Sequence, residues 1–140
     1  MQVVLEMREK ELEARQMEMA KILATLNSQK EKLQTIIQSQ EENKNRLESL
    51  NMADELDIDQ VQMHQSYAVK LTTDGVNQER IIANTEAILK VKQKEVLEAH
   101  QKVEVLKKLK EKQEKEYYKE FLQAEAKEID DITSARFRLQ

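Results

Sequence analysis

Apolar residues recur every seven positions through the first third of the chain. The repeat occupies Leu5, Leu12, Met19, Leu26, Leu33, Gln40 and Leu47, and a second column three residues further on contains Ile22, Ile36 and Leu50. A seven-residue repeat on a helix of about 3.6 residues per turn winds the apolar stripe left-handedly. It predicts a helix at about residues 3–50 that supercoils with a partner. We interpret the polar Gln40 as a device that fixes register rather than as a ligand-binding residue.

An acidic segment interrupts the repeat. From Glu41 to Asp59 the chain has seven acidic and two basic residues. Asn and Asp favour turns, and an Asp carboxylate at a helix start accepts hydrogen bonds from the unpaired amides of the first turn. The pattern predicts a turn at about residues 51–58, with Asp57 or Asp59 as N-cap of the next helix. Solvation of this exposed turn is favoured over a docking role.

A second helix is predicted at about residues 59–137. Its seven-residue repeat is Ile82, Leu89, Val96 and Val103, with Ala99 and Leu106 in the neighbouring column and Ile81 and Ile88 widening the stripe. Gly75 is expected to soften this helix without ending it. The fold class predicted is all-α: an antiparallel two-helix coiled coil, a long α-hairpin with a longer second helix, in a single domain of residues 1–140.

The two predicted helices differ in length, and this leaves part of the second one without a partner. Folding the chain about its acidic turn sets Leu5 against the region of Val103, so the first helix runs out near Lys107. Residues 107–116 are almost purely charged there, as an unpaired helix requires. Large apolar residues then return: Tyr117, Tyr118, Phe121, Leu122, Ile129, Ile132 and Phe137. They predict a projecting arm with an exposed apolar patch.

Composition excludes most kinds of active site. The chain has no cysteine or proline, one glycine and a net charge of −4, so thiolate metal sites and phosphate-cradling glycine loops are absent. His64 and His100 lack a glutamate three residues before them, which argues against a di-iron site; both are interpreted as helix-surface residues. No enzymatic activity, cofactor or metal is expected, and the interleaved glutamates argue against nucleic-acid binding at the lysine-rich stretch. No apolar run is long enough to span a membrane.

Three segments resemble one family. The opening VLEMREKELEARQMEMA, the central QSYAVKLTTDGVNQERI and the C-terminal LKKLKEKQEKEYYKEFLQAEAKEIDDITSARF look like the FliJ family of bacterial flagellar type III export proteins. The resemblance implies a cytoplasmic stalk, peripheral at the inner face of the cell membrane only through its partners. Those partners would be the hexameric flagellar export ATPase, an export gate protein and export chaperones.

The resemblance and the apolar arm together suggest which residues bind the ATPase. Family positions match Leu5, Arg8 and Leu12 at the start and Ile129, Asp130, Asp131, Ile132, Arg136 and Phe137 near the end, and the patch adds Tyr117, Tyr118 and Phe121. Aromatic and Arg side chains often carry interface energy. Two alternatives stay open: a chaperone-like or tethering homodimeric coiled coil, and, with less support, a metal-carboxylate helical enzyme.

Overall fold

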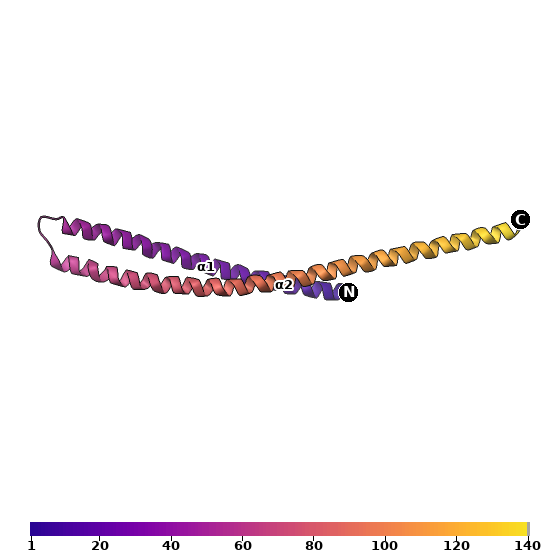
Figure 1. Cartoon of the computed structure of the whole chain (residues 1–140), viewed down its shortest axis with the longest axis horizontal. Coiled ribbons are helices and arrows are strands. Elements are labelled where there is room, and N and C mark those ends of the chain that lie inside the picture. Colours follow the sequence, from indigo (N-terminus) through magenta and orange to yellow (C-terminus); the bar gives the residue numbers. More distant parts are fainter. Residues whose placement is uncertain (140) are drawn as a thin grey trace. The chain divides into compact units, whose positions relative to one another are not determined.

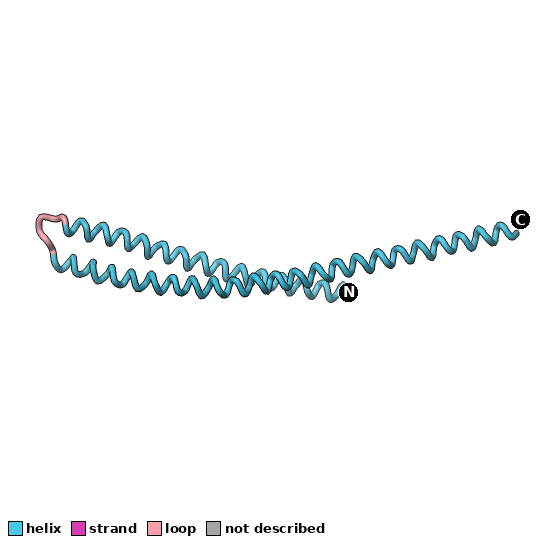
Figure 2. Tube along the Cα trace, in the orientation of Figure 1, coloured by secondary structure: helices cyan, strands magenta, loops and turns pink. Residues whose placement is uncertain are grey.

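The chain forms two helices joined by a short loop (Figures 1 and 2). The computed structural model describes residues 1–139, with α1 at Gln2–Asn51 and α2 at Ile58–Leu139. The all-α hairpin with a longer second helix is therefore confirmed, and no strand occurs in residues 1–139. Two compact units make up the chain: Arg15–Val96, and Met1–Ala14 with Leu97–Gln140. That the chain is a single domain stays a prediction.

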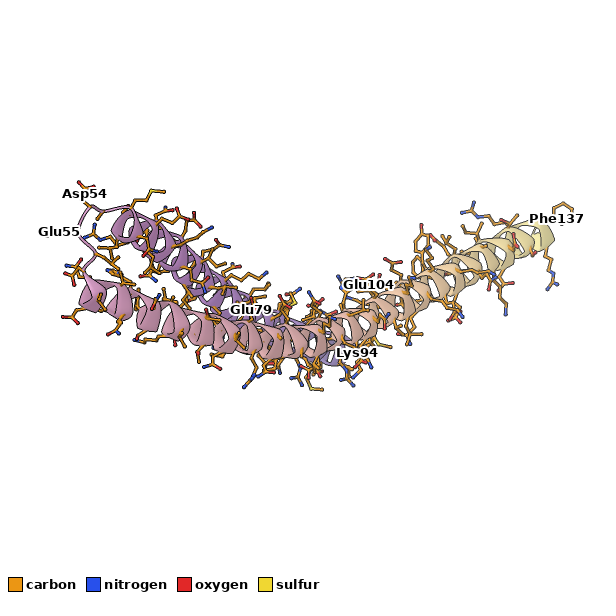
Figure 3. All side chains as sticks on the ribbon, turned by 60° about the vertical axis from the view of Figure 1, so that its left-hand side comes forward. Asp54, Glu55, Glu79, Lys94, Glu104 and Phe137 are labelled. Carbon is orange, nitrogen blue, oxygen red and sulfur yellow. The ribbon has the colours of Figure 1, made fainter. Side chains whose placement is uncertain are left out.

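The loop between the helices covers residues 52–57, and Figure 3 labels Asp54 and Glu55 in it. Asp57 is the N-cap of α2, because its Oδ1 accepts a hydrogen bond of 3.2 Å from the backbone N–H of Gln60. The carbonyl of Asp57 also accepts from the N–H of Val61 at 3.1 Å, which starts the helical hydrogen-bond pattern. Of the two N-caps considered, the structure thus selects Asp57.

In the unit Arg15–Val96, the two helices pack through a narrow seam. The buried apolar side chains are Leu26, Leu50, Leu71 and Ile82, and none of them is exposed by more than 8%. Along α2 the buried and half-buried positions follow one another at alternating steps of three and four residues, as in a coiled coil. Ile81 and Ile88, predicted to widen the stripe, are instead 43% and 48% exposed. The buried face of α2 is therefore narrower than predicted and does not include these two isoleucines. In a pair of antiparallel helices, each helix buries only two of the seven heptad positions.

Polar side chains occupy several seam positions. Asn43 donates through Nδ2 to the carbonyl of His64 at 2.9 Å, and the Oδ1 of Asn43 lies 2.8 Å from Nδ1 of His64. Gln78 donates to the carbonyl of Gln29 at 2.9 Å. The interpretation of His64 as a surface residue is therefore wrong: it is half-buried and bonded across the hairpin. These bonds tie particular residues together, so they favour one register over a slipped one.

Gly75 is buried in this seam, and α2 continues through it as predicted. A methyl group added at its Cα would lie 3.7 Å from Cγ2 of Ile36 and 3.8 Å from Nε2 of Gln40, which are ordinary contact distances. The glycine therefore lowers the stability of the helix, although the side chain of an alanine would fit at this position.

We expect Gly75→Ala to stabilise the hairpin by about 1 kcal/mol, because alanine loses less backbone entropy in a helix. Thermal unfolding followed by circular dichroism measures this. Ala83→Gly, at an exposed position of α2, is the matched control and should lower the melting temperature by a similar amount. A lower melting temperature for Gly75→Ala would show that the seam is tighter than these distances indicate.

Candidate functional site: the open end and the arm

The open end of the hairpin lies in the unit formed by Met1–Ala14 and Leu97–Gln140. Leu5 is 5% exposed and Val103 2% exposed, which agrees with their predicted pairing. The last contact between the helices joins Lys110 Nζ to Oε1 of Gln2. Beyond Lys110, no residue of α1 accompanies α2 within the described chain. Helix pairing in this unit therefore ends at Lys110, three residues later than predicted.

A shallow groove of about 460 Å³ opens beside these paired ends. Val4, Val105 and Leu106 give it an apolar lining, and the charged residues that line it are Arg8, Lys102 and Glu98. Arg8 also donates to Glu11 at 3.0 Å, so part of its hydrogen-bonding capacity is used within α1. The open end thus combines apolar surface with charged side chains of both signs next to the unpaired part of α2.

Residues 111–138, called the arm below, form one continuous helical segment in which every residue is exposed. Figure 3 shows side chains projecting on all sides of the segment that ends near Phe137, with no second helix beside it. Nothing in residues 1–139 covers its apolar side chains. The arm therefore presents large apolar groups to solvent, which monomeric proteins seldom do over a contiguous patch.

Most apolar groups of the arm follow one face, called the stripe below. Tyr118, Leu122, Ile129 and Ile132 are between 45% and 62% exposed, and steps of three, four and seven residues keep them together on a helix. At about 100° per residue, the stripe lies about a quarter turn round α2 from Val103 and Lys110, which face α1. The stripe is thus a separate surface from the hairpin seam, not its continuation.

The twelve residues predicted to bind a partner fall into two groups. Leu5, Arg8 and Leu12 lie together at the open end, where Leu5 is buried and the other two are half-buried. The other nine are exposed along the arm: Tyr117, Tyr118, Phe121, Ile129, Asp130, Asp131, Ile132, Arg136 and Phe137. They span about 30 Å of helix and form no enclosed pocket. Their role in binding stays a prediction.

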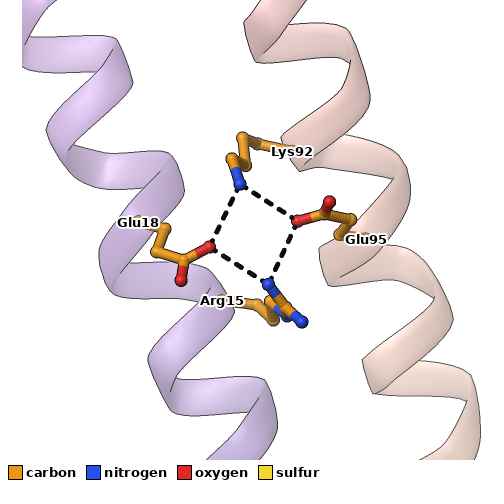
Figure 4. Close-up of polar contacts among 4 residues, drawn as sticks. All are labelled: Arg15, Glu18, Lys92 and Glu95. Carbon is orange, nitrogen blue, oxygen red and sulfur yellow. Dashed lines mark hydrogen bonds and ion pairs between the residues drawn. The ribbon is translucent and has the colours of Figure 1, made fainter.

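Four charged side chains form a closed ring of ion pairs in the unit Arg15–Val96 (Figure 4). Arg15 and Glu18 come from α1, and Lys92 and Glu95 from α2. The Oε2 atom of Glu18 lies 3.3 Å from both cations, and that of Glu95 lies 3.4 Å from both. Each carboxylate therefore bridges the two helices, and each cation does the same.

This ring changes the acidity of its members. The hydrogen bond from Lys92, helped by Arg15, lowers the pKa of the Glu18 carboxyl below its ordinary value of 4.5. The hydrogen bonds to Glu18 and Glu95 raise the pKa of Lys92 above 10.5. Both shifts favour the charged forms of Glu18 and Lys92, so the ring acts as a clamp between the two helices.

Within residues 1–139, no group of three or more His, Asp or Glu side chains is placed to hold a metal ion. No helix in that range is long and apolar enough to cross a bilayer. The candidate site is the exposed apolar and charged surface of the open end and the arm, and its role in binding stays a prediction.

Sequence reasoning missed the ion-pair ring and the polar seam contacts, although a signal for them exists. Arg8, Arg15, Gln29 and Asn43 continue the column of Ile22, Ile36 and Leu50 at seven-residue intervals. A repeat of apolar residues predicts only the apolar members of that column as seam positions, because polar side chains more often indicate a solvated face.

Comparison with known proteins gives one finding. A family model described as "Flagellar FliJ protein" matches residues 1–140, the whole chain. No curated protein matches the chain, and no solved structure does. The resemblance predicted from the three sequence segments is confirmed.

We predict a pH-dependent contribution from Glu18. A carboxyl group with a lowered pKa stabilises the fold at neutral pH, and this stabilisation is lost as the pH falls through that pKa. Glu18→Gln should therefore melt at a lower temperature than the unmodified chain near neutral pH, and the difference should shrink well below pH 4.5. Melting curves across this range measure it. Glu13→Gln, at an exposed position outside the ring, is the control. Identical pH profiles for both variants would contradict the clamp.

Proposed function

This chain belongs to the flagellar FliJ protein family, and we propose that it is a coiled-coil stalk that binds the hexameric ATPase of flagellar protein export. Its family makes it a structural component of the flagellar export apparatus. The finer role, binding to the ATPase ring, is our inference. In this proposal the ATPase hydrolyses nucleotide, and the stalk itself has no catalytic activity or cofactor.

The observation that carries the proposal is the exposure of the arm. Ile129 and Ile132 are 57% and 50% exposed, and Phe137 is 80% exposed. Removing such side chains from water on binding contributes about 25 cal/mol per Å² of apolar surface. Because α1 is absent beyond Lys110, a partner can approach the arm from every side. A ring that surrounds a single helix fits that accessibility.

Charged residues on the arm would set the orientation of the complex. Asp130 and Asp131 follow Ile129 directly, and Arg136 lies one turn beyond Ile132. A partner surface with complementary charges can match these acidic and basic side chains in only one orientation. The charges therefore contribute more to the specificity of binding than to its affinity. At the open end, Arg8 borders the groove lined by Val4 and Val105 and offers a second contact.

The other proposed partners would use the remaining surfaces. Asp54, Glu55 and Asp57 make the loop acidic and exposed, which suits a basic surface of the export gate. Ile81 and Ile88 form an exposed apolar edge of the hairpin, which suits an amphipathic helix of an export chaperone. A cytoplasmic location, next to the membrane only through these partners, follows from the same proposal.

We predict that Ile129→Asp, Ile132→Asp and Phe137→Asp together abolish capture of the export ATPase. Placing three carboxylates in an apolar interface should cost at least about 3 kcal/mol, more than a hundredfold in affinity. A pull-down with purified ATPase, followed by titration, measures the loss.

The matched control puts the same change at the other end of the hairpin. Met52, Leu56 and Ile58 are 85%, 56% and 60% exposed, and replacing all three with Asp should leave ATPase binding unchanged. Undiminished capture by the arm variant would sink the proposed site, whereas loss with both variants would point to a general effect of added negative charge.

A further inference from the structure

We propose that the arm is also a self-association surface: two copies of this chain pair their arms antiparallel through the stripe. This inference concerns the chain on its own and does not depend on the proposed ATPase contact. It rests on the order of side chains along the face of the arm that carries the stripe, because the charged residues Glu125 and Arg136 lie on that face as well.

The face that carries the stripe has the spacing of a two-stranded coiled coil. Leu122, Glu125, Ile129, Ile132 and Arg136 succeed one another at alternating steps of three and four residues, so all five lie on one face. All five are exposed, and within the described chain neither Glu125 nor Arg136 forms an ion pair with another residue. The face is therefore available to a second helix.

Antiparallel pairing makes this face complementary to itself. When Ile129 of one copy is set against Ile132 of the other, the same register sets Glu125 against Arg136. The two-fold symmetry repeats each of these contacts, so the dimer contains two Ile129–Ile132 layers flanked by two Glu125–Arg136 ion pairs. Apolar groups thus meet apolar groups, and each charge in the seam meets its opposite.

Parallel pairing of the same face is unfavourable. It would place Glu125 against Glu125 and Arg136 against Arg136 of the second copy, and like charges in a coiled-coil seam destabilise it. The positions that flank the seam also allow the antiparallel arrangement. In it, Ala126 of one copy faces Thr133 of the other, and Glu128 of one copy faces Ala135 of the other, so no like charges meet. The charge pattern therefore selects one orientation.

The hairpin leaves room for this dimer. The stripe is about a quarter turn away from the side of α2 that contacts α1, so a second arm approaches without displacing α1. The paired face from Leu122 to Arg136 covers only about two heptads, fewer than the roughly three to four of a stable coiled coil. We therefore expect a weak dimer that forms at high protein concentration and that covers the residues proposed to bind the ATPase.

A charge-swap experiment on the full chain tests this inference. Light scattering or analytical ultracentrifugation should show an average mass that rises from 16.5 kDa toward twice that value as the concentration increases. Glu125→Arg alone and Arg136→Glu alone should each weaken association by at least about tenfold. The variant carrying both changes should recover it, because the two residues lie about 16 Å apart on one helix and can pair only between copies.

Glu120→Arg combined with Arg138→Glu is the control, since both residues lie on the opposite face of the arm and should leave association unchanged. All these positions are exposed, and circular dichroism verifies that each variant folds. A chain that stays monomeric at submillimolar concentration would overturn the inference. So would a double variant that associates no better than the single ones. Either result leaves the ATPase pull-down unaffected.

Discussion

The difference in length between α1 and α2 determines which part of this molecule is exposed as a single helix. α1 has 50 residues and α2 has 82, so the seam that stabilises both helices ends while α2 continues. A helix gains most of its stability in proteins from packing one face against something else. Where pairing stops at Lys110, the arm keeps helix-forming residues and charged side chains but has apolar groups that nothing in the described chain covers. The hairpin thus leaves an exposed apolar surface on α2 where its pairing with α1 ends.

The register of the two helices fixes which residues of α2 lie beyond the paired segment. A seam of leucine and isoleucine alone tolerates slippage by a heptad, which would lengthen or shorten the arm. Asn43 with His64, Gln29 with Gln78, and the ring of Arg15, Glu18, Lys92 and Glu95 each join one position on α1 to one on α2. Polar contacts of this kind add modest stability but penalise every other register, because a slip leaves buried polar groups without partners. The position of the arm is therefore linked to the polar part of the seam.

Periodicity and counting were enough to predict the two helices, the turn and the arm. The seven-residue ladder through Leu5 and Leu26 and the excess length of the second half are properties of the chain itself, and helix geometry converts them directly into structure. Individual contacts between the helices are harder to predict from the sequence, because the register must be known to within one residue. His64 looked like a surface residue until Asn43 was placed opposite it, and Ile81 looked like a seam residue although it faces solvent. For the candidate site, the sequence predicts where the apolar patch lies along the chain. It does not predict that the patch lies on a different face of α2 from the seam.

Amide hydrogen exchange of the chain with and without the export ATPase tests the central claim most directly. The account predicts that, at low concentration, the amides of residues 111–138 exchange faster than those of the paired segments, because no packing holds that part of α2. Adding the ATPase should slow exchange across the arm and leave the loop at residues 52–57 unchanged. Protection confined to residues within Arg15–Val96, with the arm exchanging as fast as before, would contradict the account.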